Sequence, residues 1–448
     1  MDPRTAAPGL SIWQDLDEDT FRGHIVALEG RTNSVPCDAQ IFPLPVDTDG
    51  TRRLSIADEQ NLADVFAFLV AVEQGAQSVA AVCLEENVEE QSLTIRFAAV
   101  DVINTALQEL LEEIRGSLAA RALGGEGLED VEILKLVIRL HKRRILGRLR
   151  SSKWEKPTYL SRTHKKPLWE DFKNLLHRVQ FLYIKKEKVQ RKAVETSIES
   201  LGKAYESFED TLPESDDEFL HIKTLVQWSY ELCTSDLIKE YALRLAKVGP
   251  TPQVRSAIKT LRQIEKIAAY YRVTQTLLRA CKRYPYYFQH LRFEYLPPYS
   301  SIPTSIGYED WAKTCHVHAE VQLIVFYDLK NDELSITNKG GALFPRVIGA
   351  SKYLCYLCYL FMKAHGRYPP ANTHGRLYDQ WTIPDLAEMK DERRDCYRGI
   401  LKLMDQDLLQ AAANEPQWRS EPMTSRENLL DAVQDKDCIS LWRPLPPH

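Results

Sequence analysis

The sequence predicts an α/β protein in which a few short strands accompany a mainly helical region. Residues 78–84 and 92–100 alternate between apolar and polar side chains on either side of a polar turn, as two paired strands do. Residues 103–118 repeat apolar side chains at helical spacing. Thr251 is a good N-cap and Pro252 suits the first helical position, so a long helix is expected to begin there.

Further elements follow from the same kinds of pattern. A helix is expected over 62–72 and another over 386–413. Short strands are expected at 293–296, which Pro297 follows directly, and at 347–349. Strands are therefore expected towards both ends of the chain, with mainly helical structure between them.

Length and composition are those of an ordinary intracellular globular protein. The 448 residues suffice for two or three domains, and 44% hydrophobic with 27% charged residues is typical of such proteins. Nine cysteines in so long a chain indicate a reducing compartment, cytoplasmic or nuclear. No apolar run approaches the roughly 20 residues of a membrane-spanning helix, so no membrane is expected as a partner. A net charge of −5 leaves nucleic-acid binding to a local patch.

Two short motifs indicate a metal centre. His318-Ala319-Glu320 is followed by Cys355-Tyr356-Leu357-Cys358. His318, Cys355 and Cys358 are three ligands of the kind zinc prefers, and a catalytic zinc site keeps three protein ligands and leaves the fourth position open. Bound zinc lowers the pKa of its water to about 7. Glu320 is then free to carry protons.

The local structure around the cysteines can also be predicted. Cys-x-x-Cys suits the start of a helix, where the helix N-terminus stabilises thiolates, and Ser351 is a plausible N-cap. Each motif alone has another interpretation, because His-x-Glu occurs by chance and the cysteines could be buried core residues. His316 and His318 would also share one side of a strand, as in the metal sites of cupin-like barrels.

The order of the motifs resembles the signature of zinc deaminases, His-x-Glu followed by Pro-Cys-x-x-Cys. On these residues the chain resembles the cytidine deaminase superfamily, and more closely its fungus-expanded branch of predicted nucleic-acid or nucleotide deaminases. The closer match includes Arg346-Val347-Ile348-Gly349, the Ser351-Lys352 pair before the cysteines, and His374 to Tyr378. It covers roughly residues 290–385.

The resemblance implies a cytidine-deaminase-like three-layer α/β/α sandwich with a mixed sheet, preceded by a mainly helical N-terminal region. It implies Zn²⁺ as cofactor and hydrolytic deamination, with zinc hydroxide attacking a cytosine or adenine and Glu320 as proton shuttle. The helix that begins at Pro252 is expected to be the first helix of the sandwich. The expected segments are 1–100 (mixed α/β), 101–250 (mainly helical), 251–385 (deaminase-like zinc domain) and 386–448 (C-terminal helix and tail).

Substrate contacts are expected near the metal. The segment that begins at His374 resembles the family's next strand, so His374 and Arg376 could reach a phosphate or a base edge. Tyr353 could stack on a base at the start of the cysteine helix. Leu354 stands where the wider superfamily has proline, which leaves the backbone on the substrate side undetermined.

Residues 135–192 form a strongly basic segment, with nineteen Lys or Arg and four acidic residues. Aromatic side chains are interleaved with these charges, namely Trp154, Tyr159, Trp169, Phe172 and Tyr183. Cations and aromatic faces are what a single-stranded nucleic-acid groove uses. The segment predicts a nucleic-acid contact, or alternatively a solvated helix face.

Two functions follow. The first is a zinc-dependent nucleobase deaminase acting on nucleic acid or a nucleotide. The second is a zinc-stabilised, catalytically weak or inactive scaffold that keeps the fold; the retained Glu320 favours the first and the missing proline the second. The sequence leaves open cytosine or adenine, DNA or RNA, and the oligomeric state.

Overall fold

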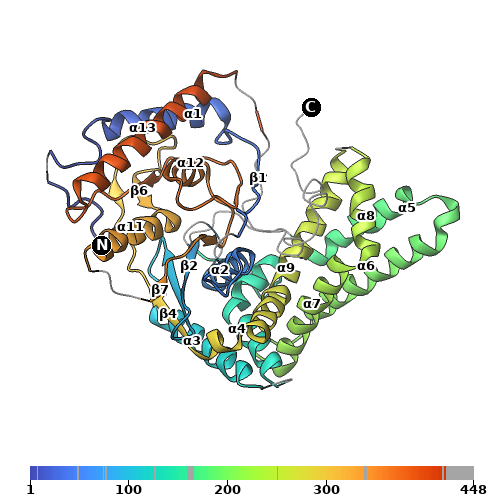
Figure 1. Cartoon of the computed structure of the whole chain (residues 1–448). Coiled ribbons are helices and arrows are strands. Elements are labelled where there is room, and N and C mark those ends of the chain that lie inside the picture. The colour runs from blue at the N-terminus through green and yellow to red at the C-terminus, as the bar shows by residue number, and fades with distance from the viewer. Residues whose placement is uncertain are drawn as a thin grey trace.

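The computed structural model confirms a mixed α/β architecture (Figure 1). The described residues are 1–7, 9–47, 50–73, 75, 78–125, 128–158, 166–249, 251–337, 341–415 and 418–419.

The helices are α1 (Glu18–Thr32), α2 (Ile56–Val70), α3 (Thr105–Ala122), α4 (Leu128–Leu149), α5 (Phe172–Leu182), α6 (Lys188–Phe208), α7 (Asp216–Thr234), α8 (Asp236–Lys247), α9 (Pro252–Arg283), α10 (Pro285–Gln289), α11 (Ala319–Thr337), α12 (Tyr356–His365) and α13 (Asp391–Ala413). The strands are β1 (Gln40–Ile41), β2 (Ala80–Asn87), β3 (Ser92–Ala99), β4 (Leu291–Tyr295), β5 (Ile302–Pro303), β6 (Thr314–Val317), β7 (Ala342–Leu343), β8 (Gly349–Ala350), β9 (Asn372–Thr373) and β10 (Trp381–Thr382). No described helix has both the length and the apolar character needed to cross a membrane.

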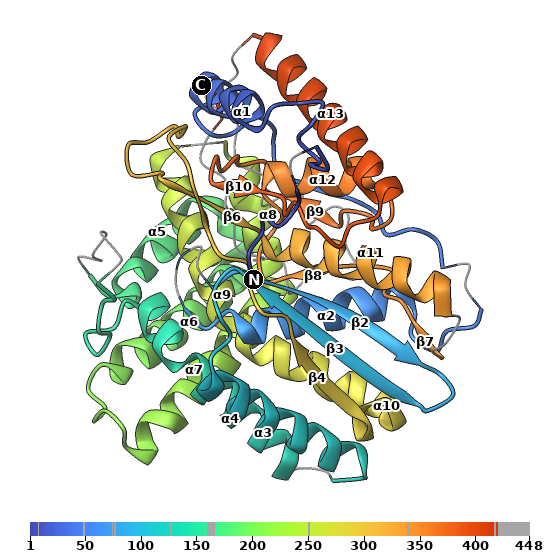
Figure 2. The ribbon, with the colours of Figure 1, turned by 90° about the vertical axis from the view of Figure 1, so that its left-hand side faces the viewer.

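A five-stranded mixed sheet forms the centre of the fold. β2 and β3 are an antiparallel hairpin, and β4 runs parallel to β3. β7 and β8 both pair antiparallel with β2 on its other edge. Figure 2 shows β2, β3 and β4 side by side. The strands predicted at 78–84, 92–100 and 293–296 are thus confirmed, and 347–349 contributes only its last residue, Gly349, to β8.

Helices cover both faces of this sheet. Successive strand residues point to opposite faces, so the residues of one strand pack against helices on both sides. Val82 and Leu84 of β2 belong to the same buried cluster as α2, whereas Ala81 and Cys83 belong to the cluster that contains α11. The sheet is therefore buried on both faces, with α2 on one and α11 on the other.

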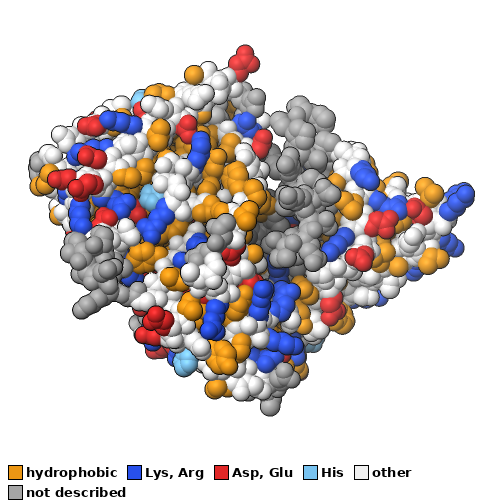
Figure 3. All heavy atoms as spheres, viewed as in Figure 1, with side chains coloured by type: hydrophobic (Ala, Val, Ile, Leu, Met, Phe, Trp, Pro, Cys, Tyr) orange, Lys and Arg blue, Asp and Glu red, His pale blue; other side chains and the backbone are white. Residues whose placement is uncertain are grey.

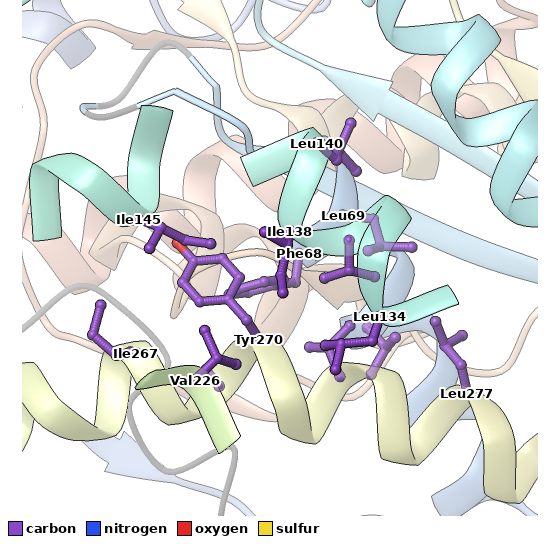
Figure 4. Packing of buried hydrophobic residues seen from close by; sticks show 14 of the residues in the cluster. Phe68, Leu69, Leu134, Ile138, Leu140, Ile145, Val226, Ile267, Tyr270 and Leu277 are labelled. Carbon is purple, nitrogen blue, oxygen red and sulfur yellow. The ribbon is translucent and has the colours of Figure 1, made fainter. Parts of the chain in front are cut away.

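The long helix α9 begins as the sequence predicts. Thr251 is its N-cap and accepts from the Val254 amide, and Pro252 occupies the first turn. The expectation that this helix is the first helix of the sandwich is wrong, because α2 packs on the sheet and α9 packs on the helices α2, α4 and α7. The apolar side chains of α9 are buried against other helices instead: in Figure 4, Tyr270 and Ile267 lie among Phe68, Ile138 and Val226.

The helices α3 to α10 lie between β3 and β4 in the chain and share their buried cluster with the α2 face of the sheet. On the other side, β10 runs parallel to β6, β1 pairs with β9, and α1 packs against α13. The division of the chain at residues 100, 250 and 385 stays a prediction, although strands from 80–99 and 291–350 share one sheet.

Buried His141 of α4 gives a prediction about pH. Its ring packs 5.1 Å from Phe68 and 5.2 Å from Tyr270, and neither ring nitrogen has a hydrogen-bond partner among the described residues. Burial, with Arg144 and Arg148, holds the pKa of His141 well below 6.5. Below about pH 6.5, His141 therefore binds a proton in the unfolded chain but not in the folded chain. The free energy of unfolding falls as the pH falls through this range.

Replacing His141 with Phe is expected to remove this dependence. Between pH 7 and pH 5 the free energy of unfolding of the variant should fall by about 2 kcal/mol less than that of the wild type, since one titrating group is gone. Urea denaturation at the two pH values measures the difference. A variant as pH-sensitive as the wild type would show that His141 does not titrate on unfolding.

Candidate metal centre

His318 and Glu320 lie where a strand passes into a helix. β6 ends at Val317, His318 follows, and α11 begins at Ala319 with Glu320 in its first turn. The Gln322 side chain fixes this junction, because its amide donates to the Val317 carbonyl at 2.9 Å and to the Ala99 carbonyl at 3.0 Å. The strand-to-helix junction is thereby tied to the end of β3.

The two cysteines lie at the start of α12. Cys355 is itself the N-cap, and its Sγ accepts from the Cys358 amide at 3.3 Å. The prediction of Ser351 as N-cap is wrong, because the Ser351 hydroxyl accepts from the Ala80 amide of β2 at 3.1 Å. Ser351 therefore fixes the start of the loop to the sheet, and residues 352–354 cross from there to the helix.

These two junctions bring three metal-binding atoms together. The ligand atoms of His318, Cys355 and Cys358 all lie within 4.8 Å of one another. The His318 Nδ1 lies 3.5 Å from the Cys355 Sγ and 3.4 Å from the Cys358 Sγ. Tetrahedral zinc with ordinary Zn–N and Zn–S bond lengths requires an N···S separation of about 3.6 Å, so the three residues fit this metal.

The cupin-like interpretation of His316 is not supported. The His316 Nε2 lies 3.2 Å from the Thr314 hydroxyl, and this histidine is not a member of the ligand group in the described part of the chain. Cys315 is a packed thiol, because it is fully buried and accepts from the Arg22 guanidinium.

The two thiols of the ligand group differ in how readily they ionise. Burial raises the pKa of a thiol, but the hydrogen bond from Cys358 and the charge of His318 hold the pKa of Cys355 well below its usual value. Burial and the neighbouring Cys355 raise the pKa of Cys358 well above its usual value. A metal binds both cysteines as thiolates. Cys355 already favours the thiolate, and a bound metal would displace the proton that remains on Cys358.

Glu320 lies beside the ligand group without being part of it. Its side chain is buried, with 4% of the residue exposed, and its Oε2 lies 3.5 Å from the Cys358 Sγ. Burial raises the pKa of this carboxyl, although the charge of His318 partly opposes the shift. A buried carboxyl with a raised pKa next to a metal site is suited to taking up and releasing protons.

The structure gives a reason for Leu354 in place of proline. The Leu354 amide donates to the Asn372 side chain at 3.2 Å, a bond that proline, which lacks the amide hydrogen, does not make. The Leu354 carbonyl accepts from the His374 amide at 3.1 Å and from the Thr373 hydroxyl at 2.9 Å. Leu354 thus joins the loop before Cys355 to β9.

A double-mutant cycle tests this bond. Removing the acceptor with Asn372→Ala leaves the buried Leu354 amide unpaired and is expected to cost about 1–3 kcal/mol of unfolding free energy. In a Leu354→Pro background the amide hydrogen is already absent, so the same substitution should cost clearly less. Urea denaturation of the four proteins gives the coupling energy. Equal costs in the two backgrounds would contradict the assignment.

The predicted substrate residues occupy different environments. His374 is buried, its Nδ1 accepts from the Arg376 amide at 3.0 Å, and burial together with Lys352 and Arg376 lowers its pKa to about 3. The Arg376 guanidinium lies 5.2 Å from the centre of the Tyr378 ring. Tyr353 is half-buried. The His374 amide donates to the carbonyl of Leu354, the residue before Cys355, and the charge of His318 contributes to the lowered pKa of His374.

The segment 374–378 is a loop and not the predicted strand. β9 ends at Thr373 and β10 begins at Trp381. Gly375 adopts a φ of +73°, and a Cβ there would lie 1.9 Å from the Cys37 carbonyl oxygen, so the chain turns sharply against residue 37. The turn directs the chain away from a strand immediately after His374.

The aromatic residues of the basic segment mostly belong to the core. Phe172 and Tyr183 are buried, and Trp154 and Trp169 pack against the same cluster. Phe172 and Tyr183 are thus used in packing, whereas Trp154 and Trp169 are only half-buried. Tyr159 lies outside the described residues. The nucleic-acid contact predicted for 135–192 stays a prediction.

Comparison with known families agrees with this geometry. Residues 317–385 match the model of a family described as OTT_1508_deam-like deaminase. The match begins one residue before His318 and includes Glu320, Cys355 and Cys358. The searches of curated proteins and of solved structures each found no match. This segment is thus a deaminase-like domain whose His/Cys/Cys group could hold a metal ion.

Proposed function

We propose that this protein is a zinc-dependent hydrolase that deaminates a nucleobase in a nucleic acid or a nucleotide. The observation that carries the proposal is the meeting of three metal ligands, His318, Cys355 and Cys358, with a buried carboxyl that is outside the ligand group. A closed structural zinc site takes four protein ligands, whereas three suit catalysis. The deaminase model that matches 317–385 supports the same reaction class.

The residues have distinct roles in this reaction. His318, Cys355 and Cys358 would hold Zn²⁺, which when bound supplies the Lewis acid that activates the attacking water. Glu320 would take one proton from that water and pass it to the ring nitrogen of the base. It would then take the remaining proton of the newly added hydroxyl group and deliver it to the departing amine. A C–O bond forms at the carbon that bears the amino group, the C–N bond breaks, and ammonia leaves.

Further assignments belong to the same proposal. The fold is proposed to be the cytidine-deaminase-like three-layer sandwich, and the chain to be a member of the fungus-expanded branch. His374, Arg376 and Tyr353 are proposed to contact the substrate. The charges of 135–192 are proposed to contact nucleic acid. An intracellular location, cytoplasmic or nuclear, is part of the proposal as well.

Release of ammonia by the zinc-loaded full chain tests the proposal. Cytosine and adenine substrates are offered as nucleosides, nucleotides, single-stranded DNA and single-stranded RNA, and Cys355→Ser, with an impaired ligand group, is the control. Release that depends on substrate and is lost in Cys355→Ser supports the deaminase. Absence of release from every substrate by protein that retains zinc would contradict it and favour the zinc-stabilised scaffold.

A further inference from the structure

Three large apolar side chains are exposed where α5 passes into α6. Phe181 in the last turn of α5 is 66% exposed, Ile184 in the connection is 65% exposed, and Val189 at the start of α6 is 84% exposed. Residues 181–192 are called the α5–α6 tip below. Figure 1 shows this tip at one end of the molecule, on the far side from α12. One exposed apolar side chain is ordinary, but several so close together indicate an interaction surface.

The conformation of the α5–α6 tip is fixed from the inside by Arg244 of α8. The Arg244 Nη1 donates to the Leu182 carbonyl at 3.0 Å, and its Nη1 and Nη2 donate to the Glu187 carboxylate at 3.0 and 2.7 Å. The same carboxylate accepts from the Ile184 amide at 3.0 Å. The Tyr183 ring is buried, with its centre 4.4 Å from the Arg244 guanidinium. The inward position is therefore taken by Tyr183, and Ile184 is held outside.

The charges of the α5–α6 tip are strongly unbalanced. Residues 181–192 contain five Lys or Arg and one acidic residue. That acid, Glu187, is paired with Arg244, and Arg191 pairs with Glu195 at 2.9 Å. The remaining four cations are exposed and have no ion-pair partner among the residues that the structure describes, namely Lys185, Lys186, Lys188 and Lys192. In Figure 3, Lys and Arg side chains lie beside hydrophobic ones at this end of the molecule.

Exposed apolar side chains among lysines are complementary to an anionic lipid bilayer. Apolar side chains enter the boundary between headgroups and acyl chains, and lysines are attracted to anionic headgroups. A nucleic acid would leave the aliphatic Ile184 and Val189 unused, because they have no ring on which a base can stack. The nucleic-acid contact proposed for 135–192 can use the cations of α4, which lie outside the tip. The expectation of no membrane partner concerned a spanning helix, and a peripheral contact needs none.

We infer that the α5–α6 tip binds the surface of an anionic bilayer, with Phe181, Ile184 and Val189 entering the headgroup region and the four lysines contacting anionic headgroups. The contact is peripheral and reversible, and it does not depend on the proposed deaminase function. Because part of the attraction is electrostatic, binding is expected to weaken as the salt concentration rises and as anionic lipid is removed.

Sedimentation of the full chain with vesicles tests the inference. The vesicles consist of phosphatidylcholine alone or of phosphatidylcholine mixed with phosphatidylserine. One double variant, Phe181→Ser with Ile184→Ser, removes apolar side chains from the tip. A second, Lys185→Gln with Lys186→Gln, removes charge. A single-stranded oligonucleotide is offered to the same proteins as the competing partner.

Two double variants outside the tip are the matched controls. Val102→Ser with Leu212→Ser removes two apolar side chains that are 70% and 75% exposed. Lys203→Gln with Lys282→Gln removes two exposed lysines, the first of them on α6 like Lys188. Circular dichroism checks that every variant is folded.

The expected result is binding of the wild type to the mixed vesicles and not to phosphatidylcholine alone. Each tip variant should lose about tenfold or more of the affinity, and both controls should bind as the wild type does. Absence of binding to the mixed vesicles, or equal binding by the folded tip variants, would overturn the inference. Oligonucleotide binding that is lost in the lysine variant, without any vesicle binding by the wild type, would assign the tip to nucleic acid instead. Loss of ammonia release has no bearing on these outcomes.

Discussion

Glu320→Gln is expected to keep its zinc and to lose nearly all release of ammonia. Glutamine has the size of glutamate and leaves the three ligand atoms in place, but it cannot take up a proton from water or deliver one to the base. General acid–base catalysis by a positioned carboxyl is worth about 10²–10⁴ in rate, so kcat should fall by a factor in that range. Ammonia release and zinc content are measured on the same preparation.

Glu333→Gln is the matched control for this substitution. Glu333 lies on α11 as Glu320 does, but it is exposed on the helix surface. It should retain both zinc and activity. If Glu320→Gln kept full activity, the proton shuttle would be assigned to the wrong residue. If it lost its zinc, Glu320 would be a metal ligand.

Asp328→Ala is expected to cause the largest loss of stability. Asp328 of α11 is 1% exposed and joins three helices: it accepts from His365 of α12 at 2.9 Å and from Tyr397 of α13 at 2.8 Å, and it pairs with Arg393 at 3.3 Å. Its removal leaves His365 and Tyr397 without this acceptor, whereas Arg393 keeps Asp332. Breaking a buried charge network of this kind costs about 3–5 kcal/mol.

Asp332→Ala is the control for Asp328→Ala, because Asp332 lies one turn further along α11 and also pairs with Arg393, at 2.8 Å. This pair is more exposed, so its loss should cost at most about 1 kcal/mol. Urea denaturation at pH 7 compares the two variants. Similar costs for both would contradict the role of Asp328 as the residue that holds α11 and α12, and hence the ligand group, in place.

Local patterns of the sequence predicted the individual elements well. The alternation in 78–84 and 92–100 predicted β2 and β3, and Thr251-Pro252 predicted the start of α9. The neighbours of these elements could not be predicted, because pairing of β2 with β8 joins residues almost 270 positions apart. The choice of α2 over α9 as the helix on the sheet depends on the same non-local packing.

The ligand group could be predicted because short motifs with fixed spacing identify its residues. The contacts around it could not be predicted, because they depend on residues that are distant in the sequence. The bond from Leu354 to Asn372 needs a strand 18 residues away, and the turn at Gly375 arises from the close approach of Cys37.

The most direct test of the metal centre is the zinc content of the purified full chain, measured by elemental analysis beside Cys355→Ser. We predict about one zinc per chain in the wild type, because the His318, Cys355 and Cys358 ligand atoms form one group. The variant, with one thiolate replaced by a hydroxyl, should lose most of it. Folded wild-type protein without zinc, or zinc retained in full by Cys355→Ser, would contradict the assignment of this centre.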